Sequence, residues 1–136
     1  MSQENVQRAY QAVEAISRGD IEAALEFADP EIEWIPNASF PVGAAERYHG
    51  HDGIRRWYQE WFVEPWEHVK VELEDPIDVG NDRYVFTAHV QGRGKASGIE
   101  VDMRIFDVWS FRDGKLAHRA SYMDKAEALE AAGLSE

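Results

Sequence analysis

Hydrophobic and polar residues alternate along the stretch "GIEVDMRIFDVWSF", residues 98–111. Strict alternation predicts a β-strand with one apolar face, because successive side chains point to opposite faces of a sheet. The apolar set consists of Ile99, Val101, Met103, Ile105, Trp109 and Phe111. Asp107 falls on the same face, between Ile105 and Trp109. A carboxyl group among apolar side chains makes this strand the first place to look for chemistry.

The N-terminal residues show helical rather than alternating spacing. Apolar side chains recur at Val6, Tyr10, Val13 and Ile16. This spacing predicts a helix over residues 3–17. Gly19 and Asp20 then supply a helix stop and an N-cap for a second helix over residues 21–27. Two short helices are therefore expected to open the chain.

A short strand and a third helix are expected next. Pro30 ends the second helix, and the strand "EIEWIP" stops at Pro36. Residues 37–49 show no periodicity, so we expect a loop that covers the mouth of a pocket. The stretch "HGHDGIRRWYQEWF", residues 49–62, then carries an apolar stripe at helical spacing.

Strands dominate the C-terminal half. Turn signals divide it into strands over residues 66–75, 83–91, 98–111 and 115–123, which predict an antiparallel meander. The tail "DKAEALEAAGL" predicts a short closing helix with an Asp N-cap. The order of elements predicts an α+β fold, with helices on one face of a curved antiparallel sheet.

Length and charge narrow the possibilities. With 136 residues, the chain is expected to form a single domain over residues 1–136. Its net charge of −12 predicts no binding to nucleic acid or to an anionic membrane. No apolar run approaches the roughly 20 residues that cross a bilayer, and "MSQENVQRAY" lacks the features of a signal peptide. We therefore expect a soluble, cytoplasmic protein. The lack of cysteine excludes thiolate catalysis.

Asp107 is the leading candidate for acid–base chemistry. Removal from water disfavours the ionised carboxylate, so a buried Asp107 is suited to act as a general acid or a neutral hydrogen-bond donor. In the alternative, Asp107 bonds a buried aromatic residue, pairs with Arg119 or lies near water. His89 faces the same side as Asp107 in one strand register and faces solvent in the other.

Aromatic residues are abundant enough to line a cavity as well as a core. The expected ligand-binding wall consists of Trp34, Tyr48, Trp57, Tyr58, Met103 and Trp109. Trp61 and Phe62 are expected to pack in the core. His49 and His51 have no third ligand suggested nearby, so we expect no metal. No phosphate loop, nucleophile elbow or dinucleotide fingerprint is present, and no cofactor is expected.

Three stretches together resemble the SnoaL-like branch of the nuclear transport factor 2-like superfamily: "AISRGDIEAALEFADPEIEWIP", "YHGHDGIRRWYQEW" and "DVWSFRDGKLAHRASYMDKAEAL". The resemblance implies a cone-shaped α+β barrel with a deep pocket, usually dimeric through the open face of the sheet. It also implies a range of functions. Members include polyketide cyclases, ketosteroid isomerases, epoxide hydrolases and domains without catalysis.

The ketosteroid isomerases within this superfamily imply roles for individual residues. Asp107 falls on the neutral aspartic acid that donates a hydrogen bond to the steroid oxyanion, and Tyr58 on a pocket tyrosine of the third helix. Arg119 falls on an inward position of the last strand. Their general base corresponds to Ile35 and their oxyanion tyrosine to Ala12, so steroid isomerisation by that mechanism is not expected.

The leading hypothesis is a homodimer, formed through the sheet face, that binds a small, apolar, oxygenated molecule. Cofactor-free acid–base chemistry of the cyclase or isomerase type is a possible addition, with Asp107 as proton donor or acceptor. Arg119 and His89 would orient a ligand oxygen or tune that carboxyl. The rival is a non-catalytic ligand-binding or dimerisation domain. An open cavity at Asp107 favours the enzyme, whereas a closed pair of Asp107 with Arg119 favours the rival.

Overall fold

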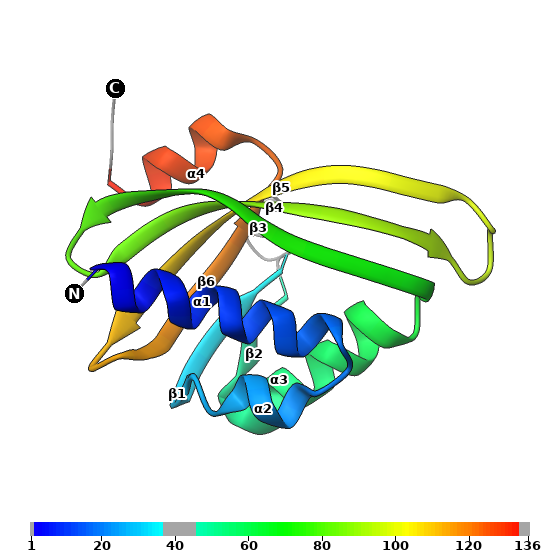
Figure 1. The fold of residues 1–136 in the computed structure, drawn as a ribbon, viewed down its shortest axis with the longest axis horizontal. Helices are drawn as coiled ribbons and strands as arrows, with labels where there is room; N and C mark the ends of the chain where they lie inside the picture. Colours follow the sequence, from blue (N-terminus) through cyan, green and yellow to red (C-terminus); the bar gives the residue numbers. More distant parts are fainter. Residues whose placement is uncertain (1, 37–45, 134–136) are drawn as a thin grey trace.

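The computed structural model describes residues 2–36 and 46–133. Its helices are α1 (Ser2–Ser17), α2 (Ile21–Leu25), α3 (Gly50–Trp57), the π-helical turn η1 (Tyr58–Val63) and α4 (Lys125–Ala131). Its strands are β1 (Ala28–Ile35), β2 (Tyr48–His49), β3 (Trp66–Gly80), β4 (Arg83–Gly94), β5 (Glu100–Arg112) and β6 (Lys115–Tyr122). Figure 1 shows that α1, α2 and α3 lie on one side of the sheet and α4 on the other.

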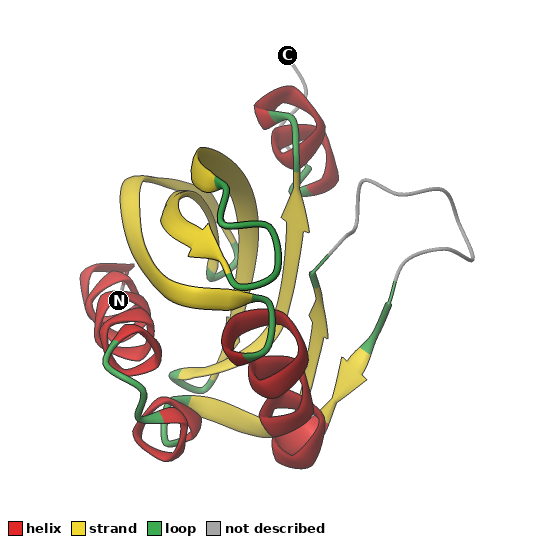
Figure 2. Ribbon diagram, turned by 90° about the vertical axis from the view of Figure 1, so that its right-hand side faces the viewer, coloured by secondary structure: helices red, strands yellow, loops and turns green. Residues whose placement is uncertain are grey.

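The six strands form one curved, unclosed sheet in the order β2-β1-β6-β5-β4-β3. The long strands β3 to β6 pair antiparallel with their chain neighbours, which confirms the predicted meander and the α+β class. β1 instead pairs parallel with β6, an arrangement that the sequence patterns did not indicate. Figure 2 shows the strong curl of the sheet, with the N-terminal helix lying beside it.

Local chemistry explains the junction between the first two helices. Gly19 adopts a φ of +88°, a left-handed conformation that is easily reached without a Cβ atom. The side chain of Asp20 then accepts a hydrogen bond from the backbone N–H of Ala23 at 3.1 Å and so caps α2. Both predicted signals therefore act where the sequence placed them.

Three strands are longer than predicted, and one of them, β4, continues to Gly94 beyond the expected residue 91. β1 begins at Ala28, ahead of the expected residue 31, and its pairing with β6 shifts register between Ala28 and Glu33. β3 continues to Gly80 instead of ending at residue 75, because a register shift between Glu74 and Ile77 absorbs the interruption.

The core lies on both faces of the sheet. The larger cluster fills the concave side and joins α1 and α3 to inward side chains of the strands, such as Phe86 and Trp109. A smaller cluster on the convex side packs Ala128 of α4 against Val85 and Val108. The convex face is thus covered at one end only.

Of the expected loop over residues 37–49, residues 37–45 lie outside the described residues, while Tyr48 and His49 form β2. Within the described ranges, no helix has the length and apolar character needed to cross a membrane. Dimerisation through the sheet face stays a prediction.

Candidate functional site

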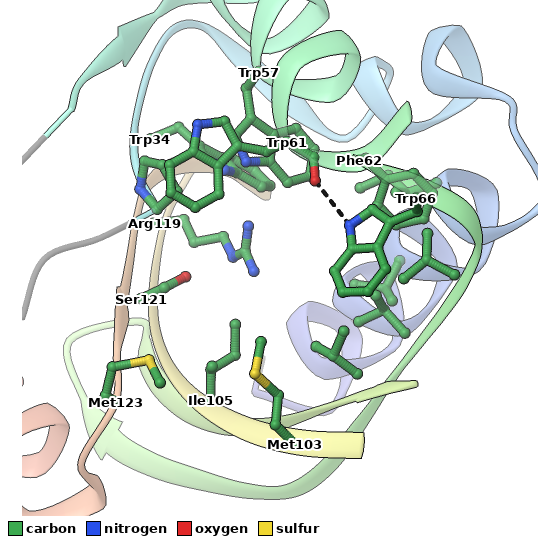
Figure 3. A pocket seen from close by; sticks show the side chains of 16 residues that line it. Trp34, Trp57, Trp61, Phe62, Trp66, Met103, Ile105, Arg119, Ser121 and Met123 are labelled. Carbon is green, nitrogen blue, oxygen red and sulfur yellow. Dashed lines mark hydrogen bonds between the residues drawn. The ribbon is translucent and has the colours of Figure 1, made fainter. Parts of the chain in front are cut away.

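An apolar pocket opens between the concave face of the sheet and the helices, with a cavity volume of about 170 Å³. The described residues that line it are Val13, Ile16, Trp34, Pro36, Trp57, Trp61, Phe62, Trp66, Val69, Val71, Val90, Met103, Ile105, Arg119, Ser121 and Met123. Figure 3 shows these side chains surrounding the hollow, with the guanidinium of Arg119 pointing into it and Ser121 nearby on the same side. Arg119 carries the only charge among these residues.

Strand alternation builds most of the wall. Val90 of β4 pairs with Met103 of β5, and both side chains face inward. The indole rings of Trp34 and Trp57 pack with their centroids 4.6 Å apart. On the far side, the Trp66 indole N–H donates to the backbone oxygen of Trp61 at 3.2 Å (Figure 3). The wall therefore combines aliphatic side chains from α1, β3, β4 and β5 with aromatic rings from β1, α3, η1 and β3.

A buried ion pair forms the base of the pocket. Arg119 donates from Nε at 3.1 Å and from Nη2 at 2.6 Å to Oδ2 of Asp107. The hydroxyl of Ser121 donates to Oδ1 of Asp107 at 2.7 Å. Asp107 has no solvent exposure and Arg119 is 8 % exposed. Both carboxylate oxygens of Asp107 are thus satisfied from β6.

Aromatic rings hold the guanidinium in place. The Cζ atom of Arg119 lies 4.1 Å from the centroid of the Trp34 ring. Trp109 and Trp57 lie at 5.7 and 5.8 Å from the same atom. A guanidinium stacked on indole faces gains cation–π attraction. The Nη1 group of Arg119 has no hydrogen-bond partner among residues 2–36 and 46–133, and it remains available to a molecule in the pocket.

This geometry changes the expected role of Asp107. The sequence pattern suggested a neutral carboxyl facing an open cavity, but Asp107 lies beneath Arg119 and does not line the pocket. Arg119 and Ser121 both donate hydrogen bonds to this carboxylate, which accepts at both of its oxygens. Asp107 therefore holds Arg119 in position, as the alternative of an Asp107–Arg119 pair anticipated.

His89 does not join this site. Asp107 pairs with Phe86 across β4 and β5, so the inward positions of β4 are the even-numbered residues. His89 points to the opposite face, where its Nε2 contacts Asp102 at 2.7 Å and its Nδ1 contacts Glu74 at 3.5 Å. The expected contribution of His89 to the site is thus not supported, since strand alternation turns its ring away from Asp107.

Among the expected wall residues, Trp34, Trp57 and Met103 line the pocket, whereas Trp109 lies deeper in the core. Tyr48 is also outside it: its hydroxyl donates to Glu60 at 2.7 Å. Burial, followed by that hydrogen bond, raises the pKa of Tyr48 to about 12.

Tyr58 turns away from the pocket as well. Its ring stacks on Phe62 with a centroid distance of 5.3 Å. Burial raises the pKa of its hydroxyl, and the charge of Asp20 adds to that rise. Tyr58 therefore supports the helix junction and does not reach a ligand.

Several lining residues were not among the predicted wall residues. Phe62 packs against the core cluster, as expected, and also lines the pocket. Trp61 was expected to pack in the core, but it is 38 % exposed and lines the pocket. Ser121 was not identified. It lies two residues after Arg119 on β6 and therefore shares its face, a signal that the alternation of this strand contained.

Histidines do not form a metal centre at the pocket. His51 Nε2 bonds the backbone oxygen of Ala28 at 3.0 Å, and His49 Nε2 contacts Glu31 at 2.9 Å. Within the described ranges, the group of possible metal ligands is Glu72, Glu74 and His89 on the convex face. Arg104 Nε lies 3.3 Å from Glu74 there, so the guanidinium of Arg104 already forms an ion pair with one of these carboxylates.

Comparison with known proteins identifies the fold. The family model of the SnoaL-like domain matches residues 6–119. An NTF2-like protein from Burkholderia thailandensis E264 is 26 % identical, with a TM-score of 0.74 over 95 % of this chain and 96 % of that chain. No curated protein sequence matches this chain.

Two further solved structures share the fold at lower identity. A candidate SnoaL-like polyketide cyclase from Jannaschia sp. CCS1 is 17 % identical, with a TM-score of 0.75 over 98 % of this chain and 94 % of that chain. TerC, crystallised with polyporic acid, is 20 % identical, with a TM-score of 0.74 over 96 % of this chain and 98 % of that chain.

Proposed function

The chain belongs to the SnoaL-like domain family, and we propose that it binds a small, largely apolar molecule through an oxygen atom that accepts a hydrogen bond from Arg119. One observation carries the proposal: the Nη1 of Arg119, which has no hydrogen-bond partner among the described residues, lies at the base of the pocket. The other described lining residues, apart from Ser121, are apolar or aromatic. Such pockets use a few placed polar groups to orient an otherwise hydrophobic ligand.

The volume limits the ligand. An engineered apolar cavity of roughly 150 Å³ takes up benzene, and the cavity here is about 170 Å³. The enclosed part of the pocket therefore suits a single ring or a similar aliphatic body. The exposed side chains of Met103 and Met123 border the open side, where a larger ligand would extend.

Binding explains the geometry better than acid–base catalysis. A general base must come within hydrogen-bonding distance of the proton that it takes. None of the described lining residues is Asp, Glu, His, Lys, Tyr or Cys, and residues 37–45 contain none of these types in the sequence. Asp107 is covered by Arg119 and Ser121. We therefore give Asp107 a positioning role.

A cyclase or isomerase activity is the second candidate. The observation that favours it is the same guanidinium, because a preorganised donor in a dry pocket stabilises negative charge that develops on a carbonyl oxygen. The similar structure named as a candidate polyketide cyclase supports this class. The proton acceptor would then have to be water or the substrate itself.

Blocking the pocket tests the binding proposal. Ile105→Trp fills the cavity from β5, whereas Arg104→Trp places the same ring on the opposite face one residue earlier. Small carbonyl compounds are titrated while the indole N–H signals are followed by nuclear magnetic resonance. We expect saturable shifts in the native protein and in Arg104→Trp, and none in Ile105→Trp. Binding that survives Ile105→Trp contradicts the proposal.

Turnover tests the second candidate. A panel of polyketide-like and steroid-like carbonyl compounds is incubated with the native protein and with Arg119→Lys. The lysine keeps the positive charge but lacks the planar guanidinium that hydrogen-bonds to Asp107. We expect a fall in turnover of about 10²-fold or more if the guanidinium stabilises the transition state. Binding without turnover in the native protein rejects the second candidate and leaves the first standing.

A further inference from the structure

We propose that the pocket selects a neutral carbonyl compound and rejects a carboxylate of the same shape. This inference rests on the proposed function and specifies its ligand class. The observation behind it is that the one cation among the described lining residues, Arg119, is already neutralised by the buried carboxylate of Asp107.

Charge balance gives the first step. Arg119 and Asp107 form a pair with an N–O distance of 2.6 Å, so the two charges sum to zero at the pocket floor. A bound carboxylate would be attracted to the guanidinium and repelled by Asp107 on its other side. The described residues that line the pocket offer no second cation to balance it. The complex would therefore hold an uncompensated negative charge.

Burial gives the second step. Asp107 is fully buried and the indoles of Trp34, Trp57 and Trp109 enclose the guanidinium. In such surroundings solvent screens the repulsion weakly, and a ligand carboxylate loses its hydration on entry. A ketone or aldehyde oxygen accepts the hydrogen bond of Nη1 without either cost. The pocket therefore discriminates by charge rather than by shape.

Acidic side chains lie near the rim, and the charge of the whole chain acts in the same direction as the burial of Asp107. The indole N–H of Trp61 donates to Glu46 at 2.9 Å, and Glu60 accepts from the Tyr48 hydroxyl behind it. Arg56 lies over the Tyr48 ring and pairs with Glu60, with its Nε 3.8 Å from Oε2 of that carboxylate. The whole chain has a net charge of −12, which further opposes the approach of an anion.

A matched pair of ligands tests the inference. Acetophenone and benzoate have the same number of non-hydrogen atoms, and benzamide is a neutral compound with the shape of benzoate. Each is titrated into the native protein and followed through the indole N–H signals. We expect acetophenone and benzamide to bind at least about tenfold more tightly than benzoate, equivalent to ~1.4 kcal/mol.

Asp107→Asn tests the cause. The amide keeps the shape of the carboxylate and leaves Arg119 with an unbalanced positive charge. We expect benzoate to gain about tenfold or more in affinity, while acetophenone changes by less than about threefold. An unchanged ratio of the two affinities overturns the inference. If the variant does not fold, the comparison of benzamide with benzoate in the native protein still separates charge from shape.

The outcomes also separate this inference from the proposed function. Benzoate binding as tightly as acetophenone in the native protein overturns the selectivity and leaves the pocket as a binding site. Failure of all three compounds to shift any indole signal overturns both proposals.

Discussion

The two faces of β5 carry ion pairs of opposite character. On the concave face, Asp107 is fully buried beneath Arg119 and Ser121, which both donate hydrogen bonds to it. On the convex face, Arg104 lies at 3.3 Å from Glu74 with half of its side chain exposed. Alternation along one strand thus places one ion pair in the protein interior and the other on the solvent-exposed surface.

The difference shows what makes a charge informative. In an exposed ion pair, each charged group gives up contacts with water for a contact with its partner, so the net gain is small. Such a pair typically contributes about 0–1 kcal/mol to stability. A buried pair must recover the loss of hydration through hydrogen bonds, and removal of one partner leaves the other uncompensated. The buried pair of Asp107 and Arg119 therefore points to a functional site, whereas the exposed pair of Glu74 and Arg104 is an ordinary surface ion pair.

The same substitution on the two faces gives the largest expected contrast. Arg119→Met leaves Asp107 buried without its counter-charge and should lower the free energy of unfolding by about 3–5 kcal/mol. Arg104→Met removes an exposed pair and should cost less than about 1 kcal/mol. Urea denaturation followed by circular dichroism measures both.

A double variant sharpens that comparison. Replacing Asp107 by Leu in the Arg119→Met background removes the stranded charge, so most of the lost stability should return. Equal losses in the two single Arg→Met variants would mean that the buried pair contributes no more than the exposed one.

Two serines provide a smaller contrast. Ser121→Ala removes the hydroxyl that donates to Oδ1 of Asp107 at 2.7 Å and should cost about 1–3 kcal/mol, because a buried acceptor loses its partner. Ser110→Ala on β5 is the control, since Ser110 makes no side-chain hydrogen bond to another described residue and faces the convex side. Its expected cost is within about 0.5 kcal/mol. Similar losses in both variants would argue against a built hydrogen-bond network around Asp107.

Much of the fold could be predicted because its signals are local. The Gly19–Asp20 junction, the alternation of residues 98–111 and the Asp124 N-cap each depend on neighbouring residues. The parallel pairing of β1 with β6 depends on residues far apart in sequence, such as Trp34 and Arg119. No local periodicity encodes that pairing, which is why the patterns did not indicate it.

The site was predictable to the extent that one strand determined it. Alternation placed Asp107 on the inner face of the sheet. An ion pair between Asp107 and Arg119 was one of the alternatives that the sequence left open. The register between β4 and β5 places His89 on the face opposite to Asp107. The sequence pattern allowed either register and therefore did not determine the position of His89. Trp61 lies in the π-helical turn η1, where the wider turn changes which side chains share a face. Helical spacing could therefore not place it on the pocket wall.

The smallest expected effect concerns pH and the convex face of β6. His118 lies 3.9 Å from Glu33, and its imidazole is partly buried. Burial lowers the pKa of His118 below its ordinary value of 6.5, Glu33 opposes that shift and Arg47 adds to it. In the unfolded chain the imidazole therefore takes up a proton at a higher pH than in the folded protein. The contribution of His118 to the free energy of unfolding is therefore largest above about pH 6.5. It is lost as the pH falls through the pKa of His118 in the folded state.

His118→Gln should remove this part of the decline. Urea denaturation at about pH 7.5, 6.5 and 5.5 should give a shallower loss of stability in the variant than in the native protein, with the remaining slope due to the other titratable groups. The difference should be small, because solvent screens a partly exposed imidazole. If the unfolding free energy of His118→Gln falls with pH as steeply as that of the native protein, or more steeply, burial does not lower the pKa of His118. The convex face would then differ from the concave face even more than the structure indicates.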